Sequence, residues 1–331
     1  MKKVQLKDIA KEVGVSPALV SYVLNGQHLN RINKNTADKI KEAAKQLNYR
    51  PNHFAKGLRT QKSTTIGLIL ADLANPFSAQ IARVIEDELK TYGYHVLIGS
   101  MDENKDNLKA LVEVFIRKQV DGLIILPAEN SREEIENIHR MNLPYVLMDR
   151  YFQNSPFNYV VNDNHYTTYT AVKQLVKNQR KKIGFITLKT DLFHITERKR
   201  GFLEACLEES IPTKNRVQEV EFNQPEKDIT KAIDALLQDC PDLDALLFST
   251  NLLTMYGLKY AIQNKLNVPK AIEIMAVDQA DFYDIFLTSI TYYKQPLEEM
   301  GKKAVQFLIA NIESDNSQTL QEIIKGHLVI T

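Results

Sequence analysis

The stretch LKDIAKEVGVSPALVSYVLNG, from Leu6 to Gly26, predicts two short helices separated by a tight turn. Its first part carries apolar residues at the spacing of one helical face, namely Leu6, Ile9, Ala10 and Val13. Gly14 suits the left-handed position that ends a helix, and Ser16 and Pro17 suit the cap and first turn of the next one. Two helices joined by a short turn that contains glycine are typical of a helix-turn-helix.

The second helix of this pair begins at Pro17 and has two chemically different faces. We expect one set of side chains to face a small core and another to face outward: Leu19, Val20, Val23 and Leu24 inward, and Pro17, Ala18, Ser21 and Tyr22 outward. A third helix is expected from about Thr36 to Leu47. In a helix-turn-helix the second helix enters the major groove of DNA and its early residues contact base edges. The helix pattern alone leaves a generic helical hairpin with a solvated lysine face equally open.

The charge of the chain is unevenly distributed. The formal net charge of all 331 residues is only +1. Residues 1–62 hold 13 Lys and Arg against 4 Asp and Glu, a net charge of +9, which leaves −8 for the other 269 residues. A basic head on an acidic body is expected when one small domain meets a polyanion. The charge distribution therefore favours nucleic-acid binding over the generic hairpin.

Three segments of the first 60 residues resemble the headpiece of the LacI family of bacterial transcription regulators: VQLKDIAKEVGVSPALVSYVLNG, INKNTADKIKEAAKQLNYRPN and AKGLR. The resemblance keeps its motifs in order and implies that Pro17, Ala18 and Tyr22 read bases. The further DNA-binding positions expected in the head are Leu6, Ser16, Ser21, Asn25 and Thr36. Serine and asparagine can donate to phosphate oxygens, and such contacts position a protein without reading sequence.

The head also departs from the family pattern. Leu19 stands where the family usually has threonine, which removes a polar contact. The loop GQHLNRIN is about two residues longer than in the best-known members, so the contacts of Leu29 to Asn33 are not transferred from the family.

The segment YRPNHFAKGLRTQKSTT predicts a linker, residues 51–62, between the head (1–50) and the body (63–331). Residues 53–59 could form two helical turns, which are too short to be stable alone in water, and Gly57 weakens them further. A plain flexible linker is one alternative. The resemblance implies instead a hinge helix that pairs with its copy in the minor groove, with Asn52, Ala55 and Leu58 as contacts. Leu58 would be the apolar wedge between base steps.

From Thr64 the chain alternates apolar strands with amphipathic helices, which predicts parallel sheets covered on both faces. Strands are expected at residues 65–72, 95–101, 122–127, 145–149, 159–163, 182–187, 245–250, 272–278, 289–293 and 323–331, with helices between most of them, for example 77–92, 106–118 and 295–312. The pattern restarts near Asn162, which indicates two similar subdomains. The expected fold is thus a small all-α headpiece plus an α/β body of two doubly wound subdomains.

The resemblance implies that this body is periplasmic-binding-protein-like, with three chain crossings, here expected near Val161, Thr291 and Ile323. Subdomain 1 would comprise residues 63–161 and 292–322, and subdomain 2 residues 162–291 and 323–331.

Polar side chains follow several of the expected strands. In open α/β sheets, ligands bind beyond the carboxyl ends of the strands. Carboxylates and arginine at such a cleft suit a polyhydroxylated ligand, because a carboxylate accepts several hydroxyl donors and arginine donates a fork. The effector-binding residues expected, most of them carried over from the family, are Asp72, Phe77, Asp149, Arg198, Phe222, Asn251 and Asp278. A single one of these acids would more simply be a helix cap or a solvated loop charge.

The sequence disfavours three other function classes. An enzyme on a doubly wound fold is disfavoured because no dinucleotide-binding, phosphate-loop, zinc-protease or nucleophile-elbow motif is present. His165 and His194 are expected to be surface or packing residues. A transport protein would need an export signal, and the start of the chain lacks an apolar signal segment. An architectural DNA protein would not need a cleft-forming body.

The sequence therefore predicts a cytoplasmic, homodimeric transcription regulator, with a repressor favoured, that binds a pseudo-palindromic double-stranded DNA operator. Its affinity for DNA would be controlled by a small-molecule effector, with a carbohydrate favoured. No membrane association, metal or cofactor is expected.

Overall fold

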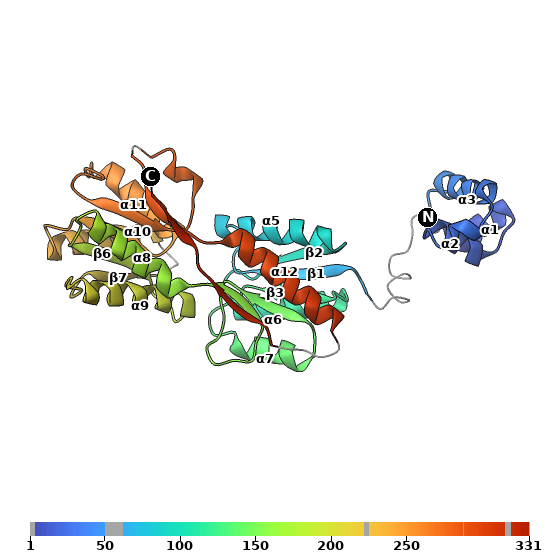
Figure 1. The fold of residues 1–331 in the computed structure, drawn as a ribbon, viewed down its shortest axis with the longest axis horizontal. Coiled ribbons are helices and arrows are strands. Elements are labelled where there is room, and N and C mark those ends of the chain that lie inside the picture. The colour runs from blue at the N-terminus through green and yellow to red at the C-terminus, as the bar shows by residue number, and fades with distance from the viewer. Residues whose placement is uncertain (1–3, 50–61, 222–224, 287, 315–318, 331) are drawn as a thin grey trace. The chain divides into compact units, whose positions relative to one another are not determined.

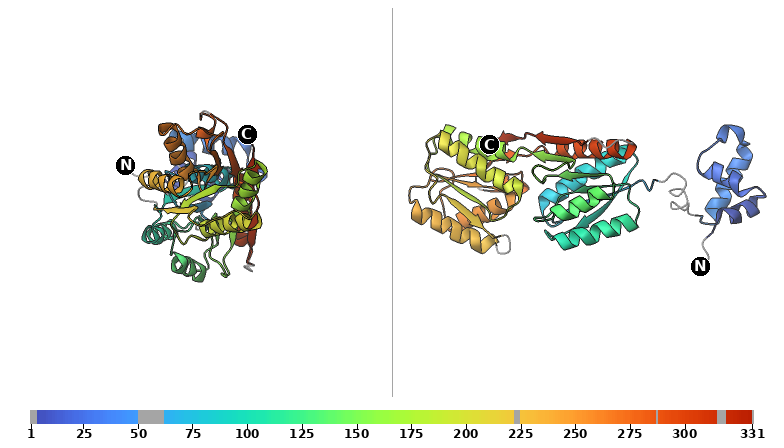
Figure 2. Two further views of the ribbon diagram at one scale, coloured as in Figure 1. Left: turned by 90° about the vertical axis from the view of Figure 1, so that its left-hand side faces the viewer. Right: turned by 90° about the horizontal axis from the view of Figure 1, so that it is seen from below.

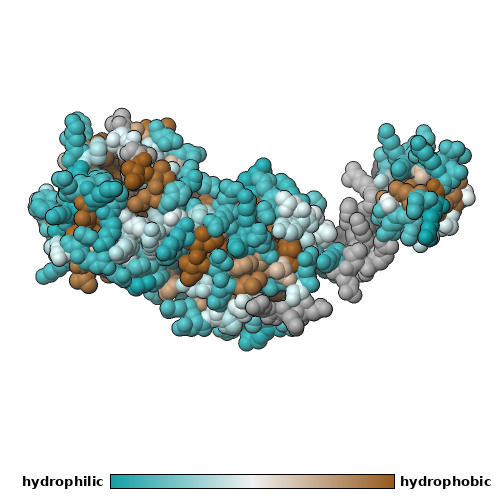
Figure 3. All heavy atoms as spheres, viewed as in Figure 1, coloured by the Kyte–Doolittle hydropathy of each residue, from teal (hydrophilic) through white to brown (hydrophobic). Residues whose placement is uncertain are grey.

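The computed structural model describes residues 4–49, 62–221, 225–286, 288–314 and 319–330, and divides into two compact units, residues 1–63 and 64–331 (Figure 1). No helix among these described residues is long and apolar enough to cross a membrane. The side of the second unit seen in Figure 3 is mostly hydrophilic and carries scattered apolar patches.

The first unit is a small helical domain. Its elements are α1 (Leu6–Val13), α2 (Pro17–Leu24), the 3₁₀ turn η1 (Leu29–Arg31) and α3 (Lys34–Gln46). Gly14 ends α1 with a φ of 75°, and the Ser16 hydroxyl caps α2 by accepting from the Leu19 amide at 3.2 Å. Ile9, Val20 and Ile40 are among the buried side chains that join the three helices. The predicted turn and second helix are therefore confirmed.

The third helix begins two residues earlier than the predicted Thr36. Asn33 caps it by accepting from the Asn35 amide at 2.9 Å, so helical structure starts at Lys34. Four of its side chains are buried, namely Ala37, Ile40, Ala43 and Ala44. Leu19 and Leu24, both expected to face inward, are half-buried and pack against this core.

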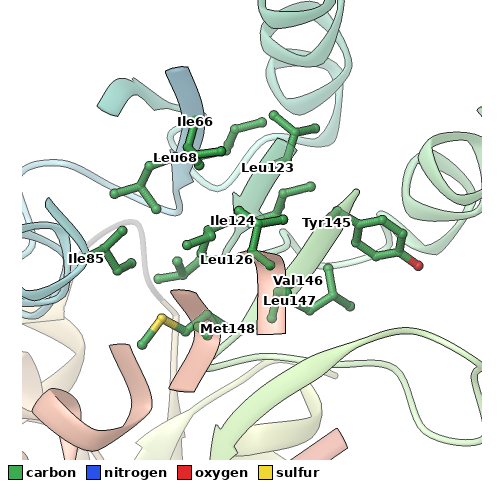
Figure 4. Close-up of a cluster of buried hydrophobic side chains, with 14 of the residues drawn as sticks. Ile66, Leu68, Ile85, Leu123, Ile124, Leu126, Tyr145, Val146, Leu147 and Met148 are labelled. Carbon is green, nitrogen blue, oxygen red and sulfur yellow. The ribbon is translucent and has the colours of Figure 1, made fainter. Parts of the chain in front are cut away.

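The first half of the body is a six-stranded, entirely parallel sheet in the order β11-β5-β4-β3-β1-β2. Its elements are β1 (Thr65–Leu70), α5 (Pro76–Thr91), β2 (His95–Ser100), α6 (Lys105–Arg117), β3 (Gly122–Ile125), α7 (Arg132–Arg140), β4 (Tyr145–Met148), β5 (Tyr159–Asn162), α12 (Leu297–Glu313) and β11 (Gln321–Ile324). Helices α5 and α12 pack together on one face, and α6 and α7 lie on the other (Figure 1). Strands β1, β3 and β4 supply the centre of the core, with Leu68, Ile124 and Leu147 fully buried (Figure 4).

The second half repeats this arrangement with the sheet order β12-β10-β9-β8-β6-β7. Its elements are α8 (Asn164–Lys177), β6 (Ile183–Leu188), α9 (Phe193–Glu208), β7 (Val217–Val220), α10 (Pro225–Asp239), β8 (Ala245–Phe248), α11 (Asn251–Gln263), β9 (Glu273–Val277), η2 (Asp281–Tyr283), β10 (Thr291–Lys294) and β12 (His327–Val329). Helices α8 and α9 pair on one face, and α10 and α11 on the other. Only β12 is antiparallel to its neighbour in the described part of this sheet.

The chain crosses between the halves three times, after β5, after β10 and after β11 (Figure 1 and Figure 2). The crossing predicted near Thr291 is present but lies slightly later, after Lys294, because β10 hydrogen-bonds to β9 and β12 and so belongs to the second half through Lys294. Helix α12 consequently starts at Leu297, not at Gln295.

The chain end was also predicted incorrectly. Residues 323–331 do not form one strand, since β11 pairs with β5 in the first sheet and β12 with β10 in the second. Residues 323 and 324 therefore belong to the first half. Strand β7 was not predicted, because its sequence VQEV is short and lies at a partly exposed sheet edge.

Candidate functional site

The outer face of α2 presents a compact set of small and polar side chains. Pro17, Ala18 and Tyr22 are exposed, and 39% of the Tyr22 surface is accessible. The Ser16 hydroxyl uses a lone pair to cap the helix, which leaves its hydrogen free to donate. These four residues lie on the surface where the sequence predicts DNA contacts, with Pro17, Ala18 and Tyr22 expected to meet bases and the Ser16 hydroxyl able to donate to phosphate.

The other residues of the head that were predicted to contact DNA lie in different structural environments. The Asn25 amide donates to the Ser21 carbonyl at 2.8 Å and contacts the Ser21 hydroxyl at 3.2 Å, so it also stabilises the end of α2. Thr36 lies half-buried in the first turn of α3. Leu6 packs against the head core, which gives its side chain a structural role. Asn52, Ala55 and Leu58, and Phe222 in the body, lie outside the described residues.

A cavity of about 270 Å³ lies in the body and is lined from both halves. Five of the predicted effector residues line it, namely Phe77, Asp149, Arg198, Asn251 and Asp278. Asp72 is not among the described lining residues. Its carboxylate instead accepts from the Ala74 amide at 2.8 Å, which stabilises the turn after β1.

Asp149 and Asp278 occupy equivalent places in the two halves. They follow β4 and β9, which stand third in their respective sheet orders. Both have left-handed backbones, with φ of 66° and 74°, a conformation that aspartate tolerates better than most residues. Each amide donates to the neighbouring strand, that of Asp149 to Val160 at 3.1 Å and that of Asp278 to Tyr293 at 2.9 Å. The repeated turn brings one carboxylate from each half to the same cavity.

Arg198 is held rigidly although it is charged and only 2% exposed. Its guanidinium donates to Asn164 at 2.8 Å and to the Ser249 carbonyl at 2.6 Å, and lies 3.8 Å from Asp278. Gly201, one turn later, allows α9 to approach α8, because a Cβ there would lie 2.1 Å from the His165 carbonyl. The RKRGF motif therefore combines a fixed cation with the close helix packing that positions it.

Arg150 and Glu103 form an ion pair at the cavity that sequence spacing did not predict. The guanidinium donates to both Glu103 oxygens, at 2.6 and 2.7 Å, and to the Pro127 carbonyl at 3.2 Å. The two residues are 47 positions apart, so only the strand order β4-β3-β1-β2 brings the loops after β4 and β2 together. Glu103 follows a strand end, which is the one local signal that could have drawn attention to it.

Burial changes the protonation of two lining groups. It raises the pKa of Asp149 to about 6, although the Arg150 and Arg198 charges oppose this shift. Burial also lowers the pKa of His194 well below its ordinary value, and the same two arginines act in the same direction. The imidazole is therefore neutral at neutral pH. His194 is buried, as expected for a packing residue, and it also lines the cavity, which was not predicted.

Three buried polar atoms at the cavity have no hydrogen-bond partner within the described chain, namely Arg150 Nε, His194 Nδ1 and Gln295 Oε1. Gln295 was not predicted. It lies between β10 and α12, and its amide donates to the Asp278 carboxylate. Burying a polar atom without a partner is unfavourable, and a bound polar ligand would satisfy such atoms.

Comparisons with known proteins match both units to models of the same family. Residues 5–52 match the family model described as bacterial regulatory proteins, lacI family, and residues 63–330 match that of periplasmic binding proteins and the sugar binding domain of the LacI family. The chain is 29% identical to catabolite control protein A of Priestia megaterium, covering 96% of both chains. It is also 29% identical to the ribose operon repressor of Halalkalibacterium halodurans, covering 98% of this chain and 95% of that one.

Solved structures share the fold. The lac repressor dimer bound to operator and the anti-inducer ONPF superposes with a TM-score of 0.87 at 20% identity, covering 99% of this chain and 98% of that one. A complex of the transcriptional regulator CelR with cellobiose gives a TM-score of 0.72 at 22% identity, with 99% of both chains covered. With the two family models covering nearly the whole length, the chain belongs to the LacI family of bacterial regulatory proteins and is a DNA-binding transcription regulator, not an enzyme.

Proposed function

We propose that this regulator is a cytoplasmic, homodimeric repressor whose affinity for a pseudo-palindromic operator is controlled by a carbohydrate bound in the body cavity. The observation that carries the effector half of this proposal is the cavity itself, where carboxylates of both halves meet three buried polar atoms that have no hydrogen-bond partner among the described residues. Relatives named for a ribose operon and a cellobiose complex support a sugar as the effector. The exposed face of α2 supports the DNA-binding half.

The charges at the cavity favour a neutral effector. Each cationic side chain that lines it already faces a carboxylate: Arg150 pairs with Glu103, Arg198 with Asp278 and Lys189 with Glu221. Asp149 and Glu129 add further negative charge. An anionic ligand would meet no cation without a carboxylate partner among the described lining residues. A neutral polyol can donate its hydroxyl hydrogens to these carboxylates and accept from Asn251.

The route from the effector to the rest of the body passes through a crossing segment. Gln295 connects the Asp278 carboxylate to the start of α12, and α12 returns to the first half and packs against α5. An effector that engages Asp278 and Gln295 would therefore favour one arrangement of the two halves. The coupling to operator affinity must be reciprocal and is typically worth about 1–3 kcal/mol.

Selection of binding sites from random-sequence DNA tests the proposal. We expect a pseudo-palindrome that binds at least 1000-fold more tightly than random DNA, the order of magnitude usual for specific regulators. Candidate neutral sugars, among them ribose and cellobiose, are then screened for release of this site by fluorescence anisotropy. Weak binding with a steep salt dependence and no selected sequence, with or without the sugars, would contradict a sequence-specific repressor.

The raised pKa of Asp149 predicts a pH-dependent effector affinity. If effector hydroxyls donate to the ionised carboxylate, affinity rises as pH increases through about 6 and is about 10-fold weaker at pH 5 than at pH 7. The folded state also holds this proton more strongly than the unfolded chain does. The contribution of Asp149 to the free energy of unfolding therefore falls as pH rises from about 4 to about 6. Calorimetric titration of effector at several pH values measures the dependence.

The matched variant is Asp149→Asn, because asparagine tolerates the left-handed backbone at φ 66°. It is expected to bind effector more weakly at pH 7 and to lose the pH dependence between 5 and 7. If Asp149→Asn keeps the full pH dependence of effector affinity, a group other than Asp149 is responsible for it.

A further inference from the structure

The loop after α2 turns back on the helix that it leaves. Gly26 and His28 both have left-handed backbones, with φ of 69° and 53°. The Gln27 amide donates to the Tyr22 carbonyl at 2.8 Å, and the Gly26 amide to the Val23 carbonyl at 3.2 Å. These two residues reverse the chain within one turn of the helix end, so the side chain at position 28 returns to the outer face of α2.

The His28 ring contacts the Tyr22 ring there. The two ring centroids lie 5.1 Å apart with an interplanar angle of 88°, an edge-to-face arrangement. Such a pair is favourable because the positive edge of one ring meets the negative face of the other. Both residues remain exposed, so the contact supports one side of Tyr22 and leaves the rest of its ring accessible.

We propose that His28 is a positioning residue that holds the Tyr22 ring in the orientation in which it meets a base pair, so that the lengthened loop contributes to operator specificity. This inference rests on the DNA-binding role proposed for Tyr22. A side chain ordered before binding loses less conformational entropy when the complex forms. His28 thus acts on base discrimination through Tyr22, and its own contact with DNA is not required.

The test uses the full-length protein and the operator selected with the wild type. His28→Asn removes the ring while asparagine retains the left-handed turn. The strength of an edge-to-face pair predicts operator affinity about 2- to 10-fold weaker. Affinity for random DNA and the salt dependence of binding are expected to stay unchanged. On operators carrying single base-pair substitutions, His28→Asn should relax preference at the same position as Tyr22→Ala.

A double-mutant cycle separates positioning from direct contact. Adding His28→Asn to Tyr22→Ala should cause no further loss, because the ring that His28 supports is already absent. Leu29→Ala is the control, since Leu29 is exposed in the same loop and is not part of the ring pair. If the two substitutions instead cause additive losses of operator affinity, and His28→Asn makes the salt dependence of binding shallower, then His28 contacts phosphate directly. That result would overturn the positioning role. Wild-type affinity and preference in His28→Asn would overturn it as well. A wild type that selects no sequence would instead overturn the proposed function, and the inference with it.

Discussion

Asp278→Asn is expected to weaken effector binding about 100-fold and to leave operator affinity without effector nearly unchanged. A hydrogen bond to a charged group is worth about 1.5–3 kcal/mol, and losing the charge that accepts two hydroxyls therefore costs about 3 kcal/mol. Asparagine is chosen over alanine because position 278 has a φ of 74°, where alanine would add backbone strain. Arg198 keeps its bonds to Asn164 and Ser249, so the fold is retained. Titrating effector against the operator complex measures the change.

Asp72→Asn is the matched control. Asp72 also follows a strand of the body, but its carboxylate stabilises a local turn and does not line the cavity. Its substitution should leave the effector response within about twofold of the wild type, as is usual for a change away from the site. If Asp278→Asn responds at wild-type effector concentrations, the effector binds elsewhere.

Tyr22→Ala is expected to remove about 1–3 kcal/mol of base discrimination at one operator position in each half-site. The side chain is the largest on the exposed face of α2, and its hydroxyl or ring can meet a base edge or a thymine methyl group. Competition between the operator and its single base-pair variants measures the discrimination. Affinity for random DNA should change little, because phosphate contacts supply most of that binding.

Tyr92→Ala is the corresponding control, since Tyr92 is similarly exposed (42% against 39% for Tyr22) but ends a helix of the body. It should bind operator and random DNA as the wild type does. Equal losses by Tyr22→Ala on operator and random DNA would mean that Tyr22 supports general affinity and does not read a base.

Local signals explain why the head was predictable from its sequence. Gly14, Ser16 and Pro17 act through bonds and backbone angles within a few residues of themselves, so the turn and the start of α2 followed directly. The body strands were likewise visible as apolar runs, because strands buried on both faces need apolar residues throughout. The start of α3 was predicted less accurately, since Asn33 and Thr36 are both residue types that begin helices, and it is Asn33 that caps this one.

The effector cavity depended on contacts that no local pattern encodes. Asp149, Arg198 and Asp278 were expected from strand ends and motifs, but Glu103 and Gln295 reach the same cavity from other elements. His194 also lines the cavity and lies one turn before Arg198 on α9. The loops carrying Glu103 and Arg150 meet because of strand order, and Gln295 lies there because β10 pairs within the second sheet before the chain crosses.

The sequence by itself determined the helix-turn-helix, the alternation of strands and helices, and the carboxylates that follow β4 and β9. Only the tertiary structure decided which sheet β10 and β11 join, which charges neutralise one another and which polar atoms remain without partners. The physical reason is the separation along the chain of the residues that interact, because helix caps and apolar periodicity involve residues only a few positions apart. Sheet partners and buried ion pairs depend on segments tens to hundreds of residues apart, whose association is decided by the packing of the whole domain.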